Sequence, residues 1–163
     1  MKNRVLALLL ALALCLPFAA FAETDAVSSA SVNDFYASSA LTGDDLMNAI
    51  NSFSGFYLVS TTNPDGTPNS AYFIYSMVKS GDKYYLQLGL AENQSKANLL
   101  ANGCGLAVYA ATPSNEEGAK PYAVSGARIT FTAVTDEAVL AELSKDAREG
   151  TMFFEVTAVR SLG

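Results

Sequence analysis

Histidine is absent from this sequence of 163 residues. Imidazole is the commonest general base in enzymes and a frequent ligand of haem iron and zinc, so its absence removes those chemistries. Cysteine is scarce, and only Cys104 remains if the N-terminal segment is cleaved as argued below. A lone thiol forms no intramolecular disulfide and lacks partners for a thiolate site, so we assign no metal ligands and no catalytic side chain. Cys104 lies in an apolar run, which favours a buried, unreactive thiol over a reactive one.

Positive charge is also in short supply, with ten Lys and Arg against sixteen Asp and Glu and a formal net charge of −6. An acidic surface without a basic stripe repels phosphate backbones, so we expect no nucleic-acid partner. The acids Asp65, Glu92, Glu116 and Glu117 fall in predicted turns, where carboxylates are normally solvated. That placement disfavours a hydrolase or a carboxylate metal site.

The N-terminus has the pattern of a secretory signal peptide. Lys2 and Arg4 precede an apolar run over residues 5–16, and Ala20 and Ala22 form a small-residue cleavage site. The apolar run is shorter than the roughly 20 residues that span a bilayer, which disfavours the alternative of a retained membrane anchor. We therefore predict a signal peptide over 1–22, export to the periplasm or the extracellular space, and no membrane association after cleavage. The remaining 141 residues (163 minus 22) have a formal charge of −8, because two positive charges are removed.

The mature chain begins with a Ser- and Ala-rich segment over 23–41 that we expect to be a flexible lead, followed by one domain over 42–163. Thr42 begins a predicted helix whose apolar residues Leu46, Ile50 and Phe53 recur at helical spacing. Further helices are predicted over 95–102, with Gly103 as its stop, and over 136–147. Strands are predicted over 56–62, 68–78, 83–90, 106–111, 122–134 and 151–159.

This order of elements predicts a mainly β fold with short helices. Six strands favour a small barrel, because closure of the sheet removes exposed edges. The last strand is expected to turn Met152, Phe154, Val156 and Ala158 to one face, because alternate residues of a strand share a face.

Three motifs carry a resemblance to a known family. They are Val59-Ser60-Thr61-Thr62 followed by Asp65-Gly66-Thr67-Pro68, the turn and helix Gln94-Ser95-Lys96-Ala97-Asn98-Leu99 with Asn102, and Tyr122-Ala123-Val124-Ser125-Gly126-Ala127. In this order and spacing the chain, from about residue 41 to residue 162, resembles the pyridoxamine 5′-phosphate oxidase-like split barrels that bind flavin mononucleotide (FMN). The resemblance implies a six-stranded split β-barrel and a homodimer that holds one noncovalent FMN per subunit in a groove at its interface.

The resemblance also implies a set of cofactor-binding residues. The flavin ring is expected against the first two strands and the phosphate near the turn that opens the second helix, where helix N-terminal amides favour an anion. Tyr72 and Phe73 have core packing as their alternative role, Ser95 an ordinary N-cap, and Lys96 and Arg128 a surface charge. The candidate residues are Thr61, Thr62, Tyr72, Phe73, Leu88, Gly89, Gln94, Ser95, Lys96 and Arg128.

The chain departs from the family pattern at two places. Members that hold FMN tightly usually have a basic residue where this chain has Gln94 and Ser95, and the oxidase itself has an arginine near Ala71. We therefore expect no true pyridoxamine 5′-phosphate oxidase activity. Two functions of different class remain: an exported FMN-dependent oxidoreductase, in which the flavin performs hydride or electron transfer, and a noncatalytic dimeric binding module for another small ligand.

Overall fold

A computed structural model describes residues 39–112 and 124–162, all within one unit of the chain, Asp34–Gly163. The predicted signal peptide, nearly all of the predicted lead, most of the segment between the predicted strands 106–111 and 122–134, and the start of the latter strand lie outside these residues. Among the described residues, no helix combines the length and the apolar character needed to cross a membrane.

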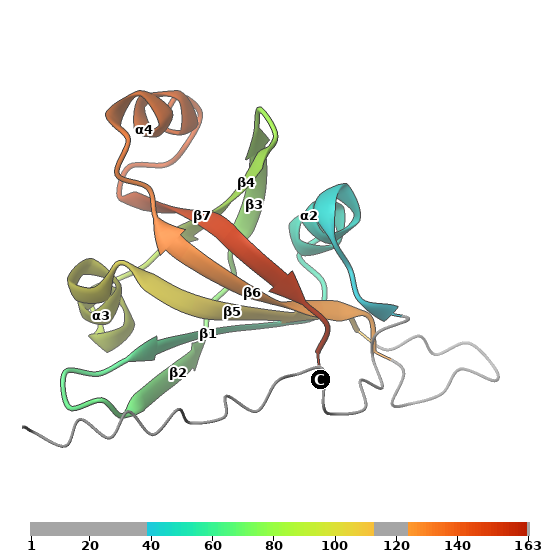
Figure 1. Cartoon of the computed structure of the whole chain (residues 1–163), viewed down its shortest axis with the longest axis horizontal. Coiled ribbons are helices and arrows are strands. Elements are labelled where there is room, and N and C mark those ends of the chain that lie inside the picture. The colour runs from blue at the N-terminus through green and yellow to red at the C-terminus, as the bar shows by residue number, and fades with distance from the viewer. Residues whose placement is uncertain (1–38, 113–123, 163) are drawn as a thin grey trace, which may run out of the picture. The chain divides into compact units, whose positions relative to one another are not determined.

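The centre of the fold is one antiparallel sheet of seven strands in the order β2-β1-β5-β6-β7-β4-β3. Figure 1 shows β1, β5, β6 and β7 side by side, with the β3–β4 hairpin extending from them. The strand bounds are β1 Phe56–Thr62, β2 Pro68–Tyr72, β3 Ser76–Ser80, β4 Lys83–Gly89, β5 Cys104–Ala110, β6 Gly126–Ala133 and β7 Thr151–Arg160.

The seventh strand arises because the predicted second strand, 68–78, is two strands. Its first part, β2, pairs with β1, whereas its second part, β3, pairs with β4 at the opposite edge of the sheet. Four residue steps from Tyr72 to Ser76 span at most roughly 14 Å. The two edges of the sheet are therefore held close together, which requires the sheet to curl as it does in a barrel.

In the described residues, three helices accompany the sheet: α2 Gly43–Asn51, α3 Gln94–Asn102 and α4 Glu137–Leu143. In α3 the Asn93 side chain accepts a hydrogen bond from the Lys96 amide, and Gly103 ends the helix with φ 65°. Only glycine adopts that angle without cost, so the predicted stop is confirmed. The predicted helix 136–147 ends early, at Leu143, so 144–150 form a loop before β7.

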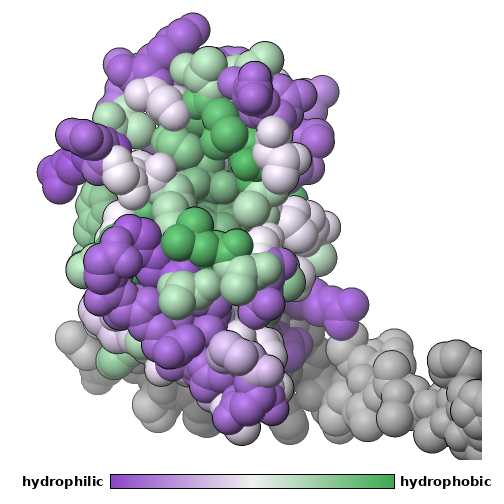
Figure 2. All heavy atoms as spheres, turned by 90° about the vertical axis from the view of Figure 1, so that its left-hand side faces the viewer, coloured by the Kyte–Doolittle hydropathy of each residue, from purple (hydrophilic) through white to green (hydrophobic). Residues whose placement is uncertain are grey.

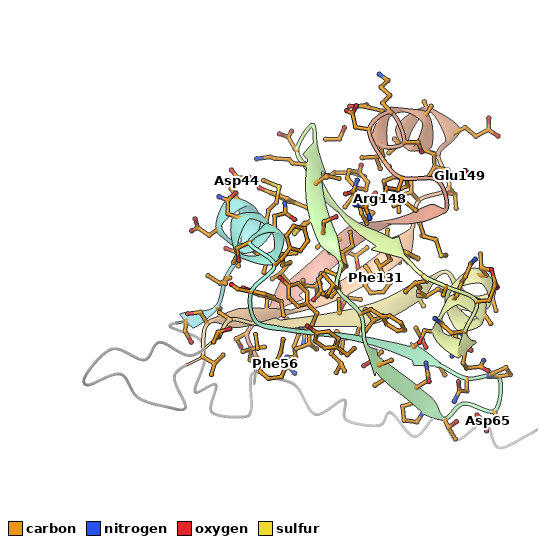
Figure 3. All side chains as sticks on the ribbon, turned by 180° about the vertical axis from the view of Figure 1, so that it is seen from behind. Asp44, Phe56, Asp65, Phe131, Arg148 and Glu149 are labelled. Atoms are coloured by element: carbon orange, nitrogen blue, oxygen red, sulfur yellow. The ribbon has the colours of Figure 1, made fainter. Side chains whose placement is uncertain are left out.

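Aromatic side chains dominate the centre of the core. The Tyr57 ring makes edge-to-face contacts with Tyr75 and Tyr109, with ring centroids 5.2 Å apart in both pairs. The Tyr57 hydroxyl donates to the Ile50 carbonyl at 2.6 Å and thereby ties α2 to β1. Phe131, labelled in Figure 3, packs against Phe154 with centroids 4.9 Å apart. Other fully buried side chains include Leu46, Val59, Met77, Leu86, Leu99 and Ile129.

Three side-chain placements differ from the sequence-based predictions. Phe53 lies beyond the end of α2 and is 60% exposed, so it does not continue the buried face of Leu46 and Ile50. Ala158 is exposed because a β-bulge at Thr130/Phe131 shifts the β6–β7 register and changes the face to which β7 residues point. Cys104 is exposed, not buried, because alternation along β5 places it on the face opposite the buried residues of that strand.

Candidate functional site

The predicted phosphate site at the start of α3 is built around buried polar side chains. Ser95 is 3% exposed and its Oγ accepts a 2.8 Å hydrogen bond from Asn69 Nδ2. Asn98 is 2% exposed and donates to Thr61 Oγ1 at 3.0 Å and to Asn63 Oδ1 at 2.9 Å. We call these five residues the amide cluster. It joins α3 to β1, β2 and the turn between them.

The remaining candidates in α3 are also engaged within the protein. Gln94 Nε2 donates to Asn98 Oδ1 at 2.7 Å, and Lys96 Nζ forms an ion pair with Glu92. The N-cap is Asn93, not Ser95, because the Asn93 side chain accepts the bond from the Lys96 amide. An anion at this helix start would therefore compete with existing partners of Ser95 and Lys96.

Two other candidates, Tyr72 and Arg128, lie in one row across the outer face of the sheet. The register pairs Tyr72 with Leu58, Leu58 with Val108, and Val108 with Arg128. Directly paired residues point to the same face of a sheet. Tyr72 is 57% exposed and Leu58 38% exposed, whereas Arg128 is half-buried and donates from Nε to the Ser161 carbonyl at 2.6 Å.

The last candidates are divided between core and surface. Leu88 is fully buried, and Phe73 is half-buried and packs against the core. Thr62 is exposed, with its carbonyl accepting a hydrogen bond from Asn102 Nδ2. Gly89 alone among the ten lines the groove described next.

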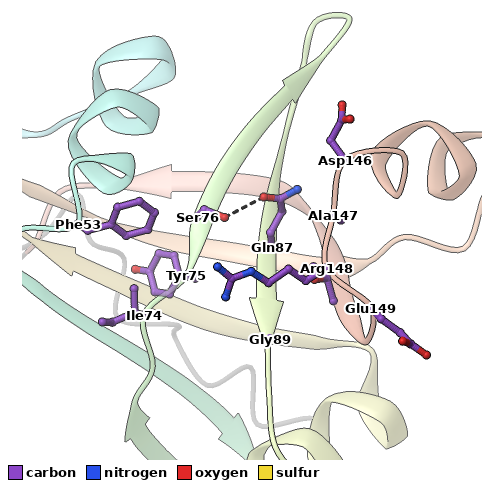
Figure 4. Close-up of a pocket in the computed structure, with 11 residues that line it drawn as sticks. Phe53, Ile74, Tyr75, Ser76, Gln87, Gly89, Asp146, Ala147, Arg148 and Glu149 are labelled. Carbon is purple, nitrogen blue, oxygen red and sulfur yellow. Dashed lines mark hydrogen bonds between the residues drawn. The ribbon is translucent and has the colours of Figure 1, made fainter.

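This groove, of about 540 Å³, lies between the β3–β4 hairpin and the loop that leads from α4 to β7. Figure 4 shows its side chains: Phe53 and Ile74 on one side, Gln87 and Gly89 on β4, and Arg148 reaching across from the loop. Pockets of about 300–1,000 Å³ with a few converging polar groups typically bind small ligands. We call it the seam groove, because Ile74 and Tyr75 belong to the segment joining the two edges of the sheet.

The apolar side of the seam groove carries backbone strain. Phe53 has φ 55°, and it is the one non-glycine residue with a positive φ that the structure reveals in residues 39–112 and 124–162. That conformation is a genuine outlier for a bulky residue and costs about 1–2 kcal/mol. The ring is nevertheless 60% exposed, and Ile74 beside the groove is 55% exposed. Phe53 directly follows Ser52, the C-cap of α2, so its left-handed backbone is that of a common helix end, taken here by a bulky residue.

Tyr75 lines the groove from within the core. It is 1% exposed, and its hydroxyl is the one buried side-chain polar atom, among the described residues, that has no hydrogen-bond partner. Burial, followed by the neighbouring hydroxyls of Tyr57 and Tyr109, raises the pKa of Tyr75 far above its ordinary value. The phenol therefore remains protonated and neutral at any physiological pH.

The floor of the groove is polar. Ser76 Oγ donates to Gln87 Oε1 at 2.8 Å across the β3–β4 pair, which leaves the Gln87 amide NH₂ as a donor. A Cβ built on Gly89 would meet no atom within 4 Å, so this end of β4 leaves space beside the backbone. A flat ligand could approach the strand there.

A cation completes the seam groove. Arg148 has no ion pair and no hydrogen bond to its guanidinium among the described residues, whereas Lys79, Lys83 and Lys96 each pair with a carboxylate. Asp146 and Glu149 also line the groove, but Figure 4 shows both side chains pointing away from the direction that Arg148 takes.

A second groove, of about 600 Å³, lies beside α3 and α4 and is lined mainly by apolar residues, including Leu99, Val134, Leu140 and Met152. Figure 2 looks onto the side that carries these helices and shows hydrophobic atoms gathered between hydrophilic ones. No charged residue lines it. The seam groove, which has both a cation and amide groups, is therefore the candidate site.

Sequence reasoning found only Gly89 of this groove. The spacing of Phe53 predicts the buried face of a helix, and Arg148 follows the predicted helix 136–147, which in the structure ends at Leu143. Arg148 carries one usable signal, since it is a cation in the otherwise acidic run Asp146–Glu149.

No protein-family model and no curated protein sequence matches this chain. Solved structures do. An FMN-binding protein from Syntrophomonas wolfei subsp. wolfei aligns with a TM-score of 0.52 and 16% identity over 74% of this chain and 85% of that one. The H111A variant of HupZ from Group A Streptococcus aligns with a TM-score of 0.50 and 19% identity over 75% and 100%. Flavoredoxin of Desulfovibrio vulgaris (Miyazaki F) aligns with a TM-score of 0.44 and 12% identity over 66% and 69%.

The first two of these likenesses establish the fold: the domain is a mainly β split barrel of the type found in FMN-binding proteins, as the sequence motifs predict. Whether the chain's residues fit FMN depends on the seam groove. An apolar, aromatic side suits a flat ring system, Gln87 and the space beside Gly89 suit its polar edge, and Arg148 suits its phosphate. The residues present therefore fit the cofactor.

Proposed function

We propose that this protein binds a flavin-type cofactor, FMN, noncovalently in the seam groove and serves as an exported oxidoreductase. The observation that carries the proposal is the groove itself: an aromatic rim, amide donors and an unpaired cation gathered in the fold of an FMN-binding protein. When bound, the flavin supplies the hydride or electron transfer.

The chain's own residues contribute binding and orientation. Phe53 and Ile74 offer apolar surface to a ring, and desolvation of that surface favours binding by about 25 cal/mol per Å². The Ser76–Gln87 hydrogen bond fixes the Gln87 side chain, so its free NH₂ presents a donor at a constant position. No side chain acts as a base in this proposal, which fits a chain without histidine.

A homodimer is part of the proposal. Phe56, Leu58 and Tyr72 lie on the outer face of the sheet and are 69%, 38% and 57% exposed. Val108 continues this surface as the cross-strand neighbour of Leu58. A contiguous exposed patch of apolar side chains is typical of an interaction surface, and a second copy of this chain offers the same patch. Export by the predicted signal peptide is proposed on the N-terminal sequence alone.

The alternative is a noncatalytic module that uses the same groove for another small ligand. The engaged side chains at the start of α3 favour it, since Ser95 and Lys96 already have partners where the family is expected to hold phosphate.

Titration of the purified protein with FMN, riboflavin and FAD, followed by flavin fluorescence and by melting temperature, tests the proposal. A ligand that binds only the folded state raises the melting temperature, by an amount that grows with its concentration over Kd. Micromolar or tighter flavin binding supports the cofactor assignment. Absence of binding by all three flavins contradicts it and favours the binding module.

A further inference from the structure

Most described cations have a partner within the protein, whereas Arg148 and the exposed Lys145 do not, and of these two only Arg148 lines the groove. Lys79 and Lys83 bind Asp44 and Glu155 at 3.1 and 2.8 Å, and Arg128 donates to a backbone carbonyl. Arg148 lines a groove of about 540 Å³ and its guanidinium contacts no described acceptor. A guanidinium has five N–H donors, so this side chain enters the groove with its donors available.

The loop that holds Arg148 directs its charges in different directions. Figure 4 shows the Arg148 side chain running across β4 toward Tyr75, while Asp146 and Glu149 project away from it. Figure 3 shows Arg148 and Glu149 on the same loop before β7, seen from behind. The loop is anchored at its end by a hydrogen bond from the Thr151 amide to the Arg148 carbonyl at 3.1 Å. The backbone of Arg148 is therefore tied to the first residue of β7.

Surrounding groups suit an anion held by Arg148. Gln87 offers an amide NH₂, because its Oε1 already accepts from Ser76. The Tyr75 phenol is neutral, so no negative charge on it opposes an anion. Guanidinium groups bind phosphate and carboxylate through two parallel hydrogen bonds, and such charge-assisted bonds are about twice as strong as neutral ones.

From this arrangement we infer that Arg148 binds the anionic group of the ligand in the seam groove, a phosphate in the case of FMN, in place of Ser95 and Lys96 at the start of α3. The inference rests on the proposed function for the identity of the ligand. It does not rest on it for the anion, because the unpaired guanidinium would hold a free phosphate through the same contacts.

The test compares FMN with riboflavin, which lacks the phosphate, in four proteins: wild type, Arg148→Gln, Lys96→Gln and Lys145→Gln. Lys145 is the matched control, because it is exposed, lies three residues earlier and does not line the groove. We expect wild type to prefer FMN by about ten- to a hundredfold, the range for a charge-assisted contact. Arg148→Gln abolishes that preference without changing riboflavin affinity, and the other two variants keep it.

A second arm uses inorganic phosphate alone and measures the melting temperature of the same four proteins. If no flavin binds but phosphate stabilises wild type more than Arg148→Gln, the anion site stands and the flavin function fails. If flavins bind and Arg148→Gln keeps the preference for FMN, or Lys96→Gln alone loses it, the inference is overturned while the flavin function stands. If neither flavin nor phosphate binds, both fail.

Discussion

Asn98 and Thr61 are 37 positions apart in the sequence, yet Asn98 Nδ2 donates a 3.0 Å hydrogen bond to Thr61 Oγ1 and both side chains are buried. This contact holds α3 against β1. Through such contacts, polar side chains at the start of α3, where the sequence predicts a phosphate site, bind other side chains of the protein instead.

Replacing Asn98 by alanine removes three hydrogen bonds and leaves buried polar groups without partners. We expect a loss of about 2 kcal/mol in the free energy of unfolding, measured by urea titration. Gln94→Ala is the control, because Gln94 is exposed and loses one of the same bonds. Its cost should stay below about 1 kcal/mol. Equal losses in the two variants would show that the burial of Asn98 adds nothing to its contribution to stability.

Two substitutions of Phe53 separate the cost of its backbone conformation from the contribution of its ring to flavin binding. Phe53→Gly removes the energetic cost of the positive φ, because glycine adopts it freely. The free energy of unfolding should therefore stay unchanged or rise by up to about 1 kcal/mol, while flavin affinity falls. Phe53→Ala removes the same ring but keeps the strain, so it should lose affinity without gaining stability. Thermal unfolding and flavin titration distinguish the two. Full flavin affinity in Phe53→Gly would show that the exposed ring has no part in binding.

Substitutions of Gly89 and Gly55 test the seam groove and the stability of the fold separately. A Cβ at this position meets no atom within 4 Å, so Gly89→Leu should fold normally while its side chain fills the groove and lowers flavin affinity by tenfold or more, roughly 1.4 kcal/mol. At Gly55 a Cβ would lie 2.4 Å from the Ala110 carbonyl oxygen and φ is 111°, so Gly55→Ala should destabilise the domain instead. Circular dichroism and flavin titration of both variants check the contrast.

Two core tyrosines should change the free energy of unfolding in opposite directions when each is replaced by phenylalanine. The Tyr75 hydroxyl has no partner, so Tyr75→Phe should raise the free energy of unfolding by about 1 kcal/mol in the absence of ligand. The Tyr57 hydroxyl donates to the Ile50 carbonyl, so Tyr57→Phe should lower it by about 1 kcal/mol. Urea titration of the two single variants measures both changes. A loss of stability in Tyr75→Phe would reveal an acceptor for its hydroxyl.

Alkaline pH should unfold the domain through the same residues. Burial, followed by Tyr109 and Tyr72, raises the pKa of Tyr57 to about 12, above the value near 10 in an unfolded chain. The stability from this group is therefore complete below pH 10 and is lost as pH rises toward 12, by about 1.4 kcal/mol per pH unit for each such tyrosine. Melting temperature and tyrosinate absorbance against pH should change together. Ionisation of all tyrosines near pH 10 without unfolding would contradict this.

Local features of the fold could be predicted because local residues determine them. Gly103 ends α3, and Asp65 and Gly66 form the expected turn, with the Thr67 amide donating to the Asp65 carboxylate at 3.0 Å. The split-barrel fold could likewise be predicted from the order of motifs, since that order fixes which strands follow one another.

Features that depend on tertiary contacts could not be predicted from the sequence. Tyr72 to Tyr75 form an unbroken run of β-favouring residues without Gly or Pro, so nothing local marks the break between β2 and β3. Phe53 fits a helical spacing that the chain leaves one residue earlier, at Ser52. The partner of Ser95 is invisible in the sequence because Asn69 lies on β2, 26 positions away.

The short link from Tyr72 to Ser76 has a mechanical consequence. This link connects β2 and β3, the two edge strands of the sheet. Two of its residues, Ile74 and Tyr75, also line the seam groove. A molecule bound there contacts the link, the β3–β4 hairpin and the loop before β7. Its binding free energy would add to the free energy needed to separate these elements. Amide hydrogens of these three elements should therefore exchange more slowly in the ligand-bound protein than in the empty one.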